Sequence, residues 1–208
     1  MKNNRRVRKW GRDTLINKLI NKFNYKRYLE IGVDTGKNFR RVKCESKISV
    51  DPRSSSHVHP TYTMTSDQFF AEIAPELELF DVIFIDGLHE TSQVDKDIRN
   101  SLKRLSKNGF IILHDCNPET REFEELRLSG DVWKSIAKLS KNVPLEYGYL
   151  TINADWGLGV ISTRISGRPN LKTIPDELTY EWLSENRYDI LRLIERGQFE
   201  SYINNGGI

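Results

Sequence analysis

Two short apolar segments, residues 80–85 and 110–113, constrain the fold more than any other part of the sequence. Each is too short for a core helix and is bounded by Gly and polar residues, a pattern typical of strands buried on both faces of a parallel sheet. Each is followed closely by an acid and a histidine: Asp86 and His89, then His114 and Asp115. Because ligands bind outside the carboxyl ends of the strands in open α/β sheets, we expect these side chains to meet in one crevice.

The composition predicts one soluble α/β domain. The 208 residues are 38% hydrophobic and 29% charged, and no apolar run approaches the ~20 residues that a membrane helix needs. The basic start of the chain leads into no apolar segment, so we expect no secretory signal. Cys44 and Cys116 are too few for a disulfide framework and indicate reduced thiols in a cytoplasmic protein. A homodimer is compatible with these features, but nothing in the sequence requires one.

The net charge of +3 is unevenly distributed. Residues 1–27 contain ten Lys or Arg residues and one acid, Asp13, whereas the remainder is acidic overall. A basic arm of this kind can bind phosphate, nucleic acid or another anionic polymer, and the alternative is a solvated helix with a frayed end. Only Trp10 stands among the basic residues at the start of the arm as a candidate for base stacking, so nucleic acid is not the favoured partner.

The order of elements predicts a doubly wound sheet. We expect a Rossmann-like, mostly parallel seven-stranded sheet with an antiparallel edge hairpin. The expected strands are 28–31, 47–50, 61–64, 80–85, 110–113, 145–152 and 157–163. The expected helices are 13–23, 37–43, one capped by Thr65 or Ser66 and ended by Pro75, one with a stripe from Val94 to Leu105 and a C-cap at Asn108-Gly109, 119–140 with a break at Ser129-Gly130, and 176–195. The expected division is a basic arm and helix over 1–25, a main domain over 26–165 and a helical extension over 166–208.

A glycine turn, residues 30–36, follows the first expected strand. Gly32 permits a tight turn and Gly36 lets the next helix pack closely. Asp51 ends the second strand, where an acid hydrogen-bonds the ribose of an adenosine-type cofactor. A dinucleotide site would need glycine at position 34, which is Asp here, and Glu30 inside the strand suits a cationic ligand. The alternative is that the glycines serve only the turn and that Asp51 only caps its strand.

On these residues the chain resembles class I S-adenosylmethionine-dependent methyltransferases, over about residues 26–118. The resemblance implies that the glycine turn lines the amino-acid end of S-adenosylmethionine, that the acid after the second strand binds its ribose, and that segment 65–70 covers its adenine. The implied cofactor contacts are Glu30, Gly32, Asp34, Gly36, Asp51, Ser66, Asp67 and Asp86.

Residues 80–89 and 109–115 resemble a narrower group, the metal-assisted small-molecule O-methyltransferases, which include sugar O-methyltransferases of macrolide pathways and catechol O-methyltransferase. The resemblance implies that Asp86 and Asp115 hold Mg²⁺ and that His89, three residues after Asp86, is the base. A divalent cation acidifies and orients a hydroxyl, and a histidine accepts a proton near neutral pH. Asp86 and His89 are therefore the expected catalytic residues.

One position departs from that group. The sugar enzymes have an acid immediately before the last Asp, where this chain has His114. Asp86, His114 and Asp115 would form a mixed metal site, better suited to Mn²⁺, Fe²⁺ or Zn²⁺ than to Mg²⁺. Asn117 is a further candidate oxygen ligand. A metal-free site with either histidine as base stays open, and so does a purely structural role for each histidine.

The sequence gives fewer indications of which residues bind the methyl acceptor. Trp133 and Trp156 are candidates for stacking on a sugar, with packing as the favoured alternative, and Asp97 is expected to face solvent. Because the fourth strand does not end in the Asn/Asp-Pro-Pro-aromatic motif of many base N-methyltransferases, we expect a hydroxyl of a saccharide or small natural product as the acceptor. Two other hypotheses stay open: an RNA or DNA methyltransferase that uses the basic arm, and a non-catalytic cofactor-binding protein.

Overall fold

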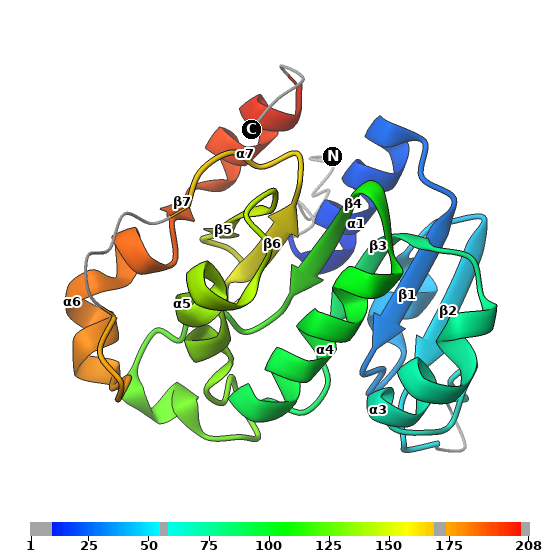
Figure 1. The fold of residues 1–208 in the computed structure, drawn as a ribbon, viewed down its shortest axis with the longest axis horizontal. Coiled ribbons are helices and arrows are strands. Elements are labelled where there is room, and N and C mark those ends of the chain that lie inside the picture. The colour runs from blue at the N-terminus through cyan, green and yellow to red at the C-terminus, as the bar shows by residue number, and fades with distance from the viewer. Residues whose placement is uncertain (1–9, 55–57, 169–173, 205–208) are drawn as a thin grey trace, which may run out of the picture.

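The computed structural model describes residues 10–54, 58–168 and 174–204, in which seven strands form one sheet (Figure 1). The strand order is β2-β1-β3-β4-β6-β5-β7. The first four strands in this order run parallel, β6 is antiparallel to β4 and β5, and β7 is parallel to β5. The strands are β1 (Arg27–Ile31), β2 (Ser46–Val50), β3 (Phe80–Ile85), β4 (Leu105–Leu113), β5 (Gly148–Ile152), β6 (Leu158–Ser162) and β7 (Leu193–Ile194).

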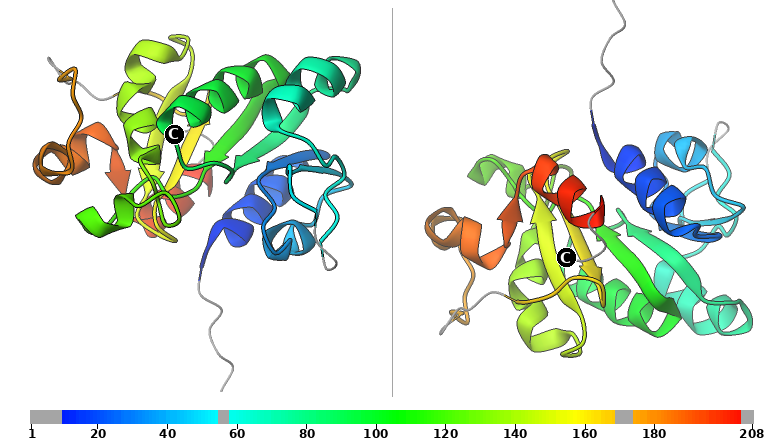
Figure 2. Two further views of the ribbon diagram at one scale, coloured as in Figure 1. Left: turned by 90° about the horizontal axis from the view of Figure 1, so that it is seen from below. Right: turned by 90° about the horizontal axis from the view of Figure 1, so that it is seen from above.

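Helices cover both faces of the sheet (Figure 2). On one face, Ile83 and Ile111 pack against the layer that contains α4 and α5, and on the other face Val82 and Phe110 pack against α1 and α7. Alternate residues at the carboxyl-terminal ends of β3 and β4 thus enter two different cores, which is why residues 82–85 and 110–113 are all apolar. The helices are α1 (Arg12–Phe23), α2 (Lys37–Arg41), α3 (Ser66–Gln68), α4 (Thr91–Arg104), α5 (Val132–Asn142), α6 (Tyr180–Ile190) and α7 (Arg196–Asn204).

The predicted doubly wound, mostly parallel sheet is confirmed, and so is the hairpin, which β5 and β6 form. The hairpin does not lie at the edge, however, because β7 pairs with the outer side of β5. The helix predicted over 176–195 ends at Ile190, and Arg192, with φ of 45°, turns the chain into β7. A strand of two residues has no periodicity from which the sequence could have predicted it.

Three other boundaries differ from the predictions. The predicted strand 61–64 is reduced to a single bridge between Val50 and Tyr62. The helix over 119–140 is replaced by a 3₁₀ turn (Arg121–Glu124) and α5, although the predicted break at Ser129-Gly130 is present. Asn108-Gly109 lies inside β4 rather than at a helix C-cap, because the pairing of β3 with β4 shifts register between Leu105 and Phe110.

The inner end of the basic arm belongs to the folded structure. α1 begins at Arg12 and buries Leu15, Ile16 and Leu19 against the sheet, whereas the basic residues at positions 2–9 lie outside the described residues. The predicted frayed tail falls largely in 205–208, which is also outside them. None of the helices in the described ranges has the length and apolar character of a membrane span.

Candidate active site

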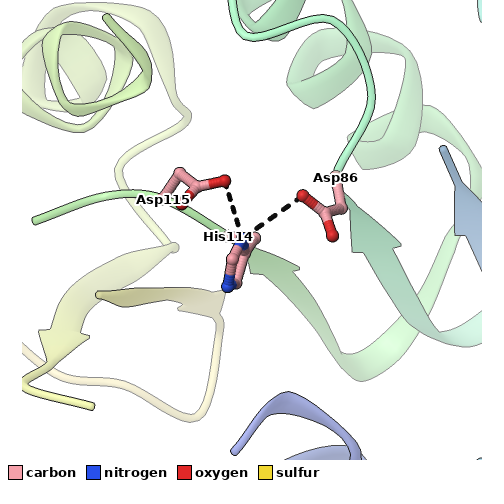
Figure 3. Close-up of side chains that lie close together, drawn as sticks. All are labelled: Asp86, His114 and Asp115. Carbon is pink, nitrogen blue, oxygen red and sulfur yellow. Dashed lines mark hydrogen bonds and ion pairs between the residues drawn. The ribbon is translucent and has the colours of Figure 1, made fainter. Parts of the chain in front are cut away.

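The polar residues that follow β3 and β4 meet at the carboxyl edge of the sheet (Figure 3). His114 Nδ1 lies 2.7 Å from Asp115 Oδ2 and 3.3 Å from Asp86 Oδ1. Asp115 has a φ of 61°, a left-handed conformation that Asp tolerates better than most residues. Its other oxygen, Oδ1, accepts a hydrogen bond from Ser129 Oγ at 3.2 Å. The expected convergence of the two strand ends is confirmed.

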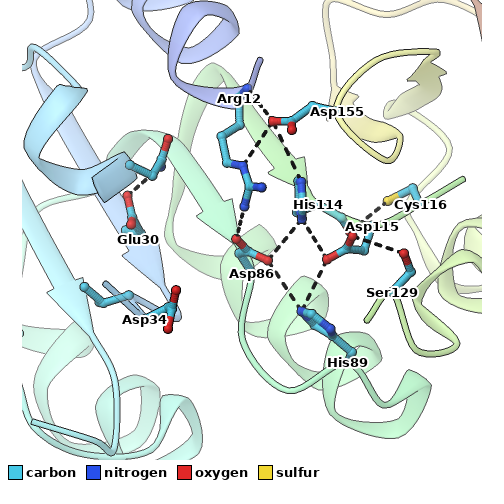
Figure 4. A network of polar contacts seen from close by, with 12 residues as sticks. Arg12, Glu30, Asp34, Asp86, His89, His114, Asp115, Cys116, Ser129 and Asp155 are labelled. Atoms are coloured by element: carbon cyan, nitrogen blue, oxygen red, sulfur yellow. Dashed lines mark hydrogen bonds and ion pairs between the residues drawn. The ribbon is translucent and has the colours of Figure 1, made fainter. Parts of the chain in front are cut away.

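His89 contacts the carboxylates of Asp86 and Asp115 from the side opposite His114 (Figure 4). Its Nε2 lies 3.5 Å from Asp86 Oδ1 and 3.4 Å from Asp115 Oδ2. Its Nδ1 lies 2.5 Å from the carbonyl oxygen of Leu128, which can only accept, so Nδ1 carries a proton. The loop that contains Leu128 approaches His89 closely, because a Cβ at Gly130 would overlap the His89 carbonyl. Nε2 is therefore the nitrogen available for proton transfer or metal binding.

Arg12 and Asp155 complete the network, and neither role was predicted. Arg12 donates from its backbone nitrogen and Nε to Asp155 Oδ2, at 2.9 and 3.1 Å, and from Nη1 to Asp86 Oδ2 at 2.5 Å. His114 Nε2 lies 3.8 Å from the same Asp155 oxygen, outside hydrogen-bond distance. Three carboxylates thus face one guanidinium and two imidazoles. No signal in the sequence relates Arg12 to two residues that lie 74 and 143 positions away.

The cluster shifts the pKa values of its members in opposite directions. Burial disfavours the charged form of Asp86, but hydrogen bonds from His114 and His89 outweigh this and hold its pKa well below the ordinary range. Burial also disfavours the cationic form of His114, yet its carboxylate partners raise its pKa to about 11. The pKa of His89 is raised in the same way, with the hydrogen bond to Asp86 as the main opposing influence to burial.

Three residues of this cluster have the chemistry of a metal site. Asp86, His114 and Asp115 each offer a ligand atom, and these atoms lie within 4.8 Å of one another. Two carboxylates and an imidazole suit Mn²⁺, Fe²⁺ or Zn²⁺. Asn117 does not join them, because its Oδ1 accepts a hydrogen bond from Arg187 and its Nδ2 donates to Asn153. The residues present therefore fit a divalent cation without Asn117.

A cavity of about 460 Å³ adjoins the cluster on the side of β1. Glu30, Gly32, Asp34 and Asp86 line it together. Burial raises the pKa of Glu30 to about 7, even though the Tyr28 hydroxyl and the Asn38 amide donate hydrogen bonds to its carboxylate. A buried carboxylate of this kind is suited to a cationic ligand.

The other predicted cofactor residues lie outside this cavity lining. Asp51 Oδ2 accepts hydrogen bonds from the backbone nitrogens of Val33 and Asp34 at 2.8 and 3.4 Å. Asp51 therefore holds the backbone of the glycine turn in place. Gly36, with φ of 68°, precedes α2. Ser66 Oγ and Asp67 Oδ1 accept hydrogen bonds from Gln93 on α4.

Gly32 is required by close packing as well as by its φ of 84°. A Cβ at this position would overlap the backbone of Asp86 and Gly87. Replacing Gly32 by Ala should therefore lower the free energy of unfolding by about 3 kcal/mol. Gly197→Ala is the matched control, since a Cβ there meets nothing within 4 Å. Equal stability of the two variants in urea denaturation would contradict the packing argument.

The structure also shows the environments of three residues for which the sequence suggested a role or an exposure: Trp133, Trp156 and Asp97. Trp133 is fully buried, donates from Nε1 to Glu124 at 2.8 Å and is a core residue, as the favoured alternative had it. Trp156 is 41% exposed and packs against Phe123, with ring centroids 4.7 Å apart. Asp97 was expected to face solvent, but it is buried on α4, where Gln93 donates to it at 3.2 Å and burial raises its pKa to about 6.

Comparisons with known proteins agree with this architecture. Residues 29–116 match a family model described as a methyltransferase domain. The structure resembles TomG, an O-methyltransferase from Streptomyces achromogenes involved in tomaymycin synthesis and solved with S-adenosylmethionine, with 13% identity and a TM-score of 0.54, over 72% of this chain and 78% of that one. It also resembles an O-methyltransferase from Bacillus cereus solved with S-adenosylhomocysteine, with 16% identity and a TM-score of 0.54, over the same shares. At these identities the likeness shows the fold. The sequence matches no curated protein.

Proposed function

We propose that the protein transfers the methyl group of S-adenosylmethionine to a hydroxyl of a saccharide or small natural product. The match of residues 29–116 to a methyltransferase-domain family model and the mostly parallel, doubly wound sheet support this proposal. The observation that carries this proposal is the position of Asp86. Its carboxylate lines the cavity at the glycine turn and also belongs to the acid–histidine cluster. A methyl donor in the cavity and an acceptor at the cluster would therefore lie side by side.

Asp86, His114 and Asp115 are the residues that would hold a divalent cation. When bound, such a cation supplies a Lewis acid that acidifies and orients the acceptor hydroxyl. His89 accepts the hydroxyl proton at Nε2, because Nδ1 is already committed to the Leu128 carbonyl. The loop that fixes Nδ1 thus determines which ring nitrogen faces the acceptor.

The donor is held along the glycine turn. Its amino-acid end lies in the cavity against Glu30, Gly32, Asp34 and Asp86. The remaining predicted contacts serve its nucleoside: Asp51 for the ribose, Ser66 and Asp67 for the adenine, and Gly36 for the close approach of α2.

Exposed apolar side chains support a small-molecule acceptor. Leu88 precedes His89 in the chain, and the carbonyl of Leu128 accepts the hydrogen bond from His89 Nδ1. The two leucines are 53% and 41% exposed. Trp156, whose carbonyl accepts from the backbone nitrogen of Asn117, is exposed close to the end of β4. Aliphatic and indole surfaces pair well with the apolar faces of sugar rings and natural products.

We further propose that the methyltransferase domain spans 26–165, with 1–25 as a basic arm and helix and 166–208 as a helical extension. We place the protein in the cytoplasm, where Cys44 and Cys116, both free, stay reduced.

The proposal is tested by calorimetric titration with S-adenosylhomocysteine, followed by transfer of a labelled methyl group to a panel of hydroxyl compounds. We expect binding of the product nucleoside, turnover on hydroxyl acceptors, and loss of turnover in EDTA that Mn²⁺ restores. Absence of S-adenosylhomocysteine binding would overturn the donor assignment. Turnover that is unchanged in EDTA would overturn the metal assignment, and transfer to polynucleotides alone would favour the nucleic-acid hypothesis.

A further inference from the structure

The start of α1 forms one wall of the donor cavity. Trp10, Gly11, Arg12 and Asp13 all line it, opposite the residues of β1 and the glycine turn. Figure 4 shows the Arg12 side chain extending from this wall to Asp86, with Glu30 on the neighbouring strand. The innermost part of the basic arm therefore lies at the cavity beside the glycine turn.

Two polar atoms in this wall and its surroundings have no partner among the described residues. Trp10 is 8% exposed, and its Nε1 is buried without a hydrogen-bond acceptor. Asn38 Oδ1 is buried without a donor, since its Nδ2 is turned toward Glu30 Oε2 at 2.8 Å. Leaving such groups unpaired costs about 1–3 kcal/mol each, and a ligand that supplies an acceptor to Trp10 and a donor to Asn38 would remove this cost.

Arg12 has spare hydrogen-bonding capacity at the same place. Its Nε and Nη1 are held by Asp155 and Asp86, whereas Nη2 makes no hydrogen bond to any described residue. Lys37 and Arg41 also line the cavity, but both are exposed, and Arg41 already lies 4.0 Å from Asp13. Arg12 is thus the cation that is both fixed in position and able to accept an additional anion.

We propose that Arg12 and Trp10 are positioning residues for the methyl donor: the guanidinium and the indole N–H together hold the donor's α-carboxylate. This inference rests on the proposed function, because it takes S-adenosylmethionine as the occupant. The donor's α-ammonium group then faces the carboxylate of Glu30, which forms no ion pair with any described residue. Arg12 and Glu30 thus offer the zwitterionic amino-acid group one partner for each of its two charges.

The test compares two ligands that share the nucleoside but differ in the amino-acid part. S-adenosylhomocysteine carries the carboxylate, whereas 5′-methylthioadenosine lacks the whole group. Calorimetric titration of Arg12→Gln should show S-adenosylhomocysteine affinity lowered by at least about tenfold, as expected for one charge-assisted hydrogen bond. Trp10→Phe should lower it by about threefold to tenfold. Methylthioadenosine affinity should stay within about twofold in both variants, which also shows that they are folded.

Two further variants sharpen the result. Arg12→Lys keeps the charge and should restore part of the lost affinity. Lys22→Gln removes an exposed cation from the last turn of the same helix and should change neither affinity. Equal losses for both ligands, or no loss for either in Arg12→Gln and Trp10→Phe, would overturn the inference alone. Failure of the wild-type protein to bind either ligand would overturn the proposed function and this inference with it.

Discussion

Replacing Asp86 by Asn is expected to lower the rate of methyl transfer at least about 10³-fold, while S-adenosylhomocysteine affinity changes far less. Among the residues that the structure describes, Asp86 is the one carboxylate that contacts Arg12, His89 and His114 at once. The amide of Asn has nearly the same shape but no charge, so three cationic partners lose their common counter-ion. The substitution would also remove one of the two carboxylates that would hold a divalent cation.

Asp189→Asn is the matched control, because Asp189 is an exposed acid on α6, away from the cluster. Turnover and Mn²⁺ binding should both be unchanged in this variant. A tenfold or greater loss of S-adenosylhomocysteine affinity in Asp86→Asn, with the transfer rate at saturating donor preserved, would show that Asp86 serves the donor and not the chemistry.

Those parts of the fold that follow from short-range pattern were predictable. Residues 82–85 of β3 and 110–113 of β4 are apolar on both faces because each face enters a different core, and this makes two continuous apolar runs in the sequence. The rule that ligands bind at the carboxyl ends of strands then placed Asp86, His89, His114 and Asp115 together without any structure.

Features that depend on tertiary contact were not predictable. Arg12 carries the same signal as the other basic residues of the arm, and only the packing of α1 on the sheet brings it to Asp86. Asp97 has the helical position of a surface acid, but α3 covers it and Gln93 satisfies it. Asn117 follows β4 in the sequence, at a position where a metal ligand is expected, but its Oδ1 accepts a hydrogen bond from Arg187 of α6 instead.

The cluster also explains how three acids are tolerated at one edge of the sheet. Asp86, Asp115 and Asp155 are balanced by Arg12 and by the two histidines, whose pKa values are raised by these same carboxylates. A divalent cation at this site would displace the proton of His114, the histidine that would ligate it. A histidine before Asp115 is therefore a group that is cationic without a metal and neutral with one, whereas an acid there would make the site more negative.

Replacing His89 by Gln is expected to lower the transfer rate about 10²-fold to 10⁴-fold, the usual contribution of a general base. The pKa of His89 is raised above its ordinary value of 6.5, so its cationic form persists to higher pH than in a free histidine and must lose the Nε2 proton before it can act. The wild-type rate should therefore rise with pH above 6.5, and this rise should disappear in His89→Gln. His59→Gln, at an exposed histidine hydrogen-bonded to Ser54, is the matched control and should keep both the rate and the rise. If His89→Gln keeps the pH dependence and loses Mn²⁺ affinity instead, His89 is a metal ligand and the proton has another acceptor.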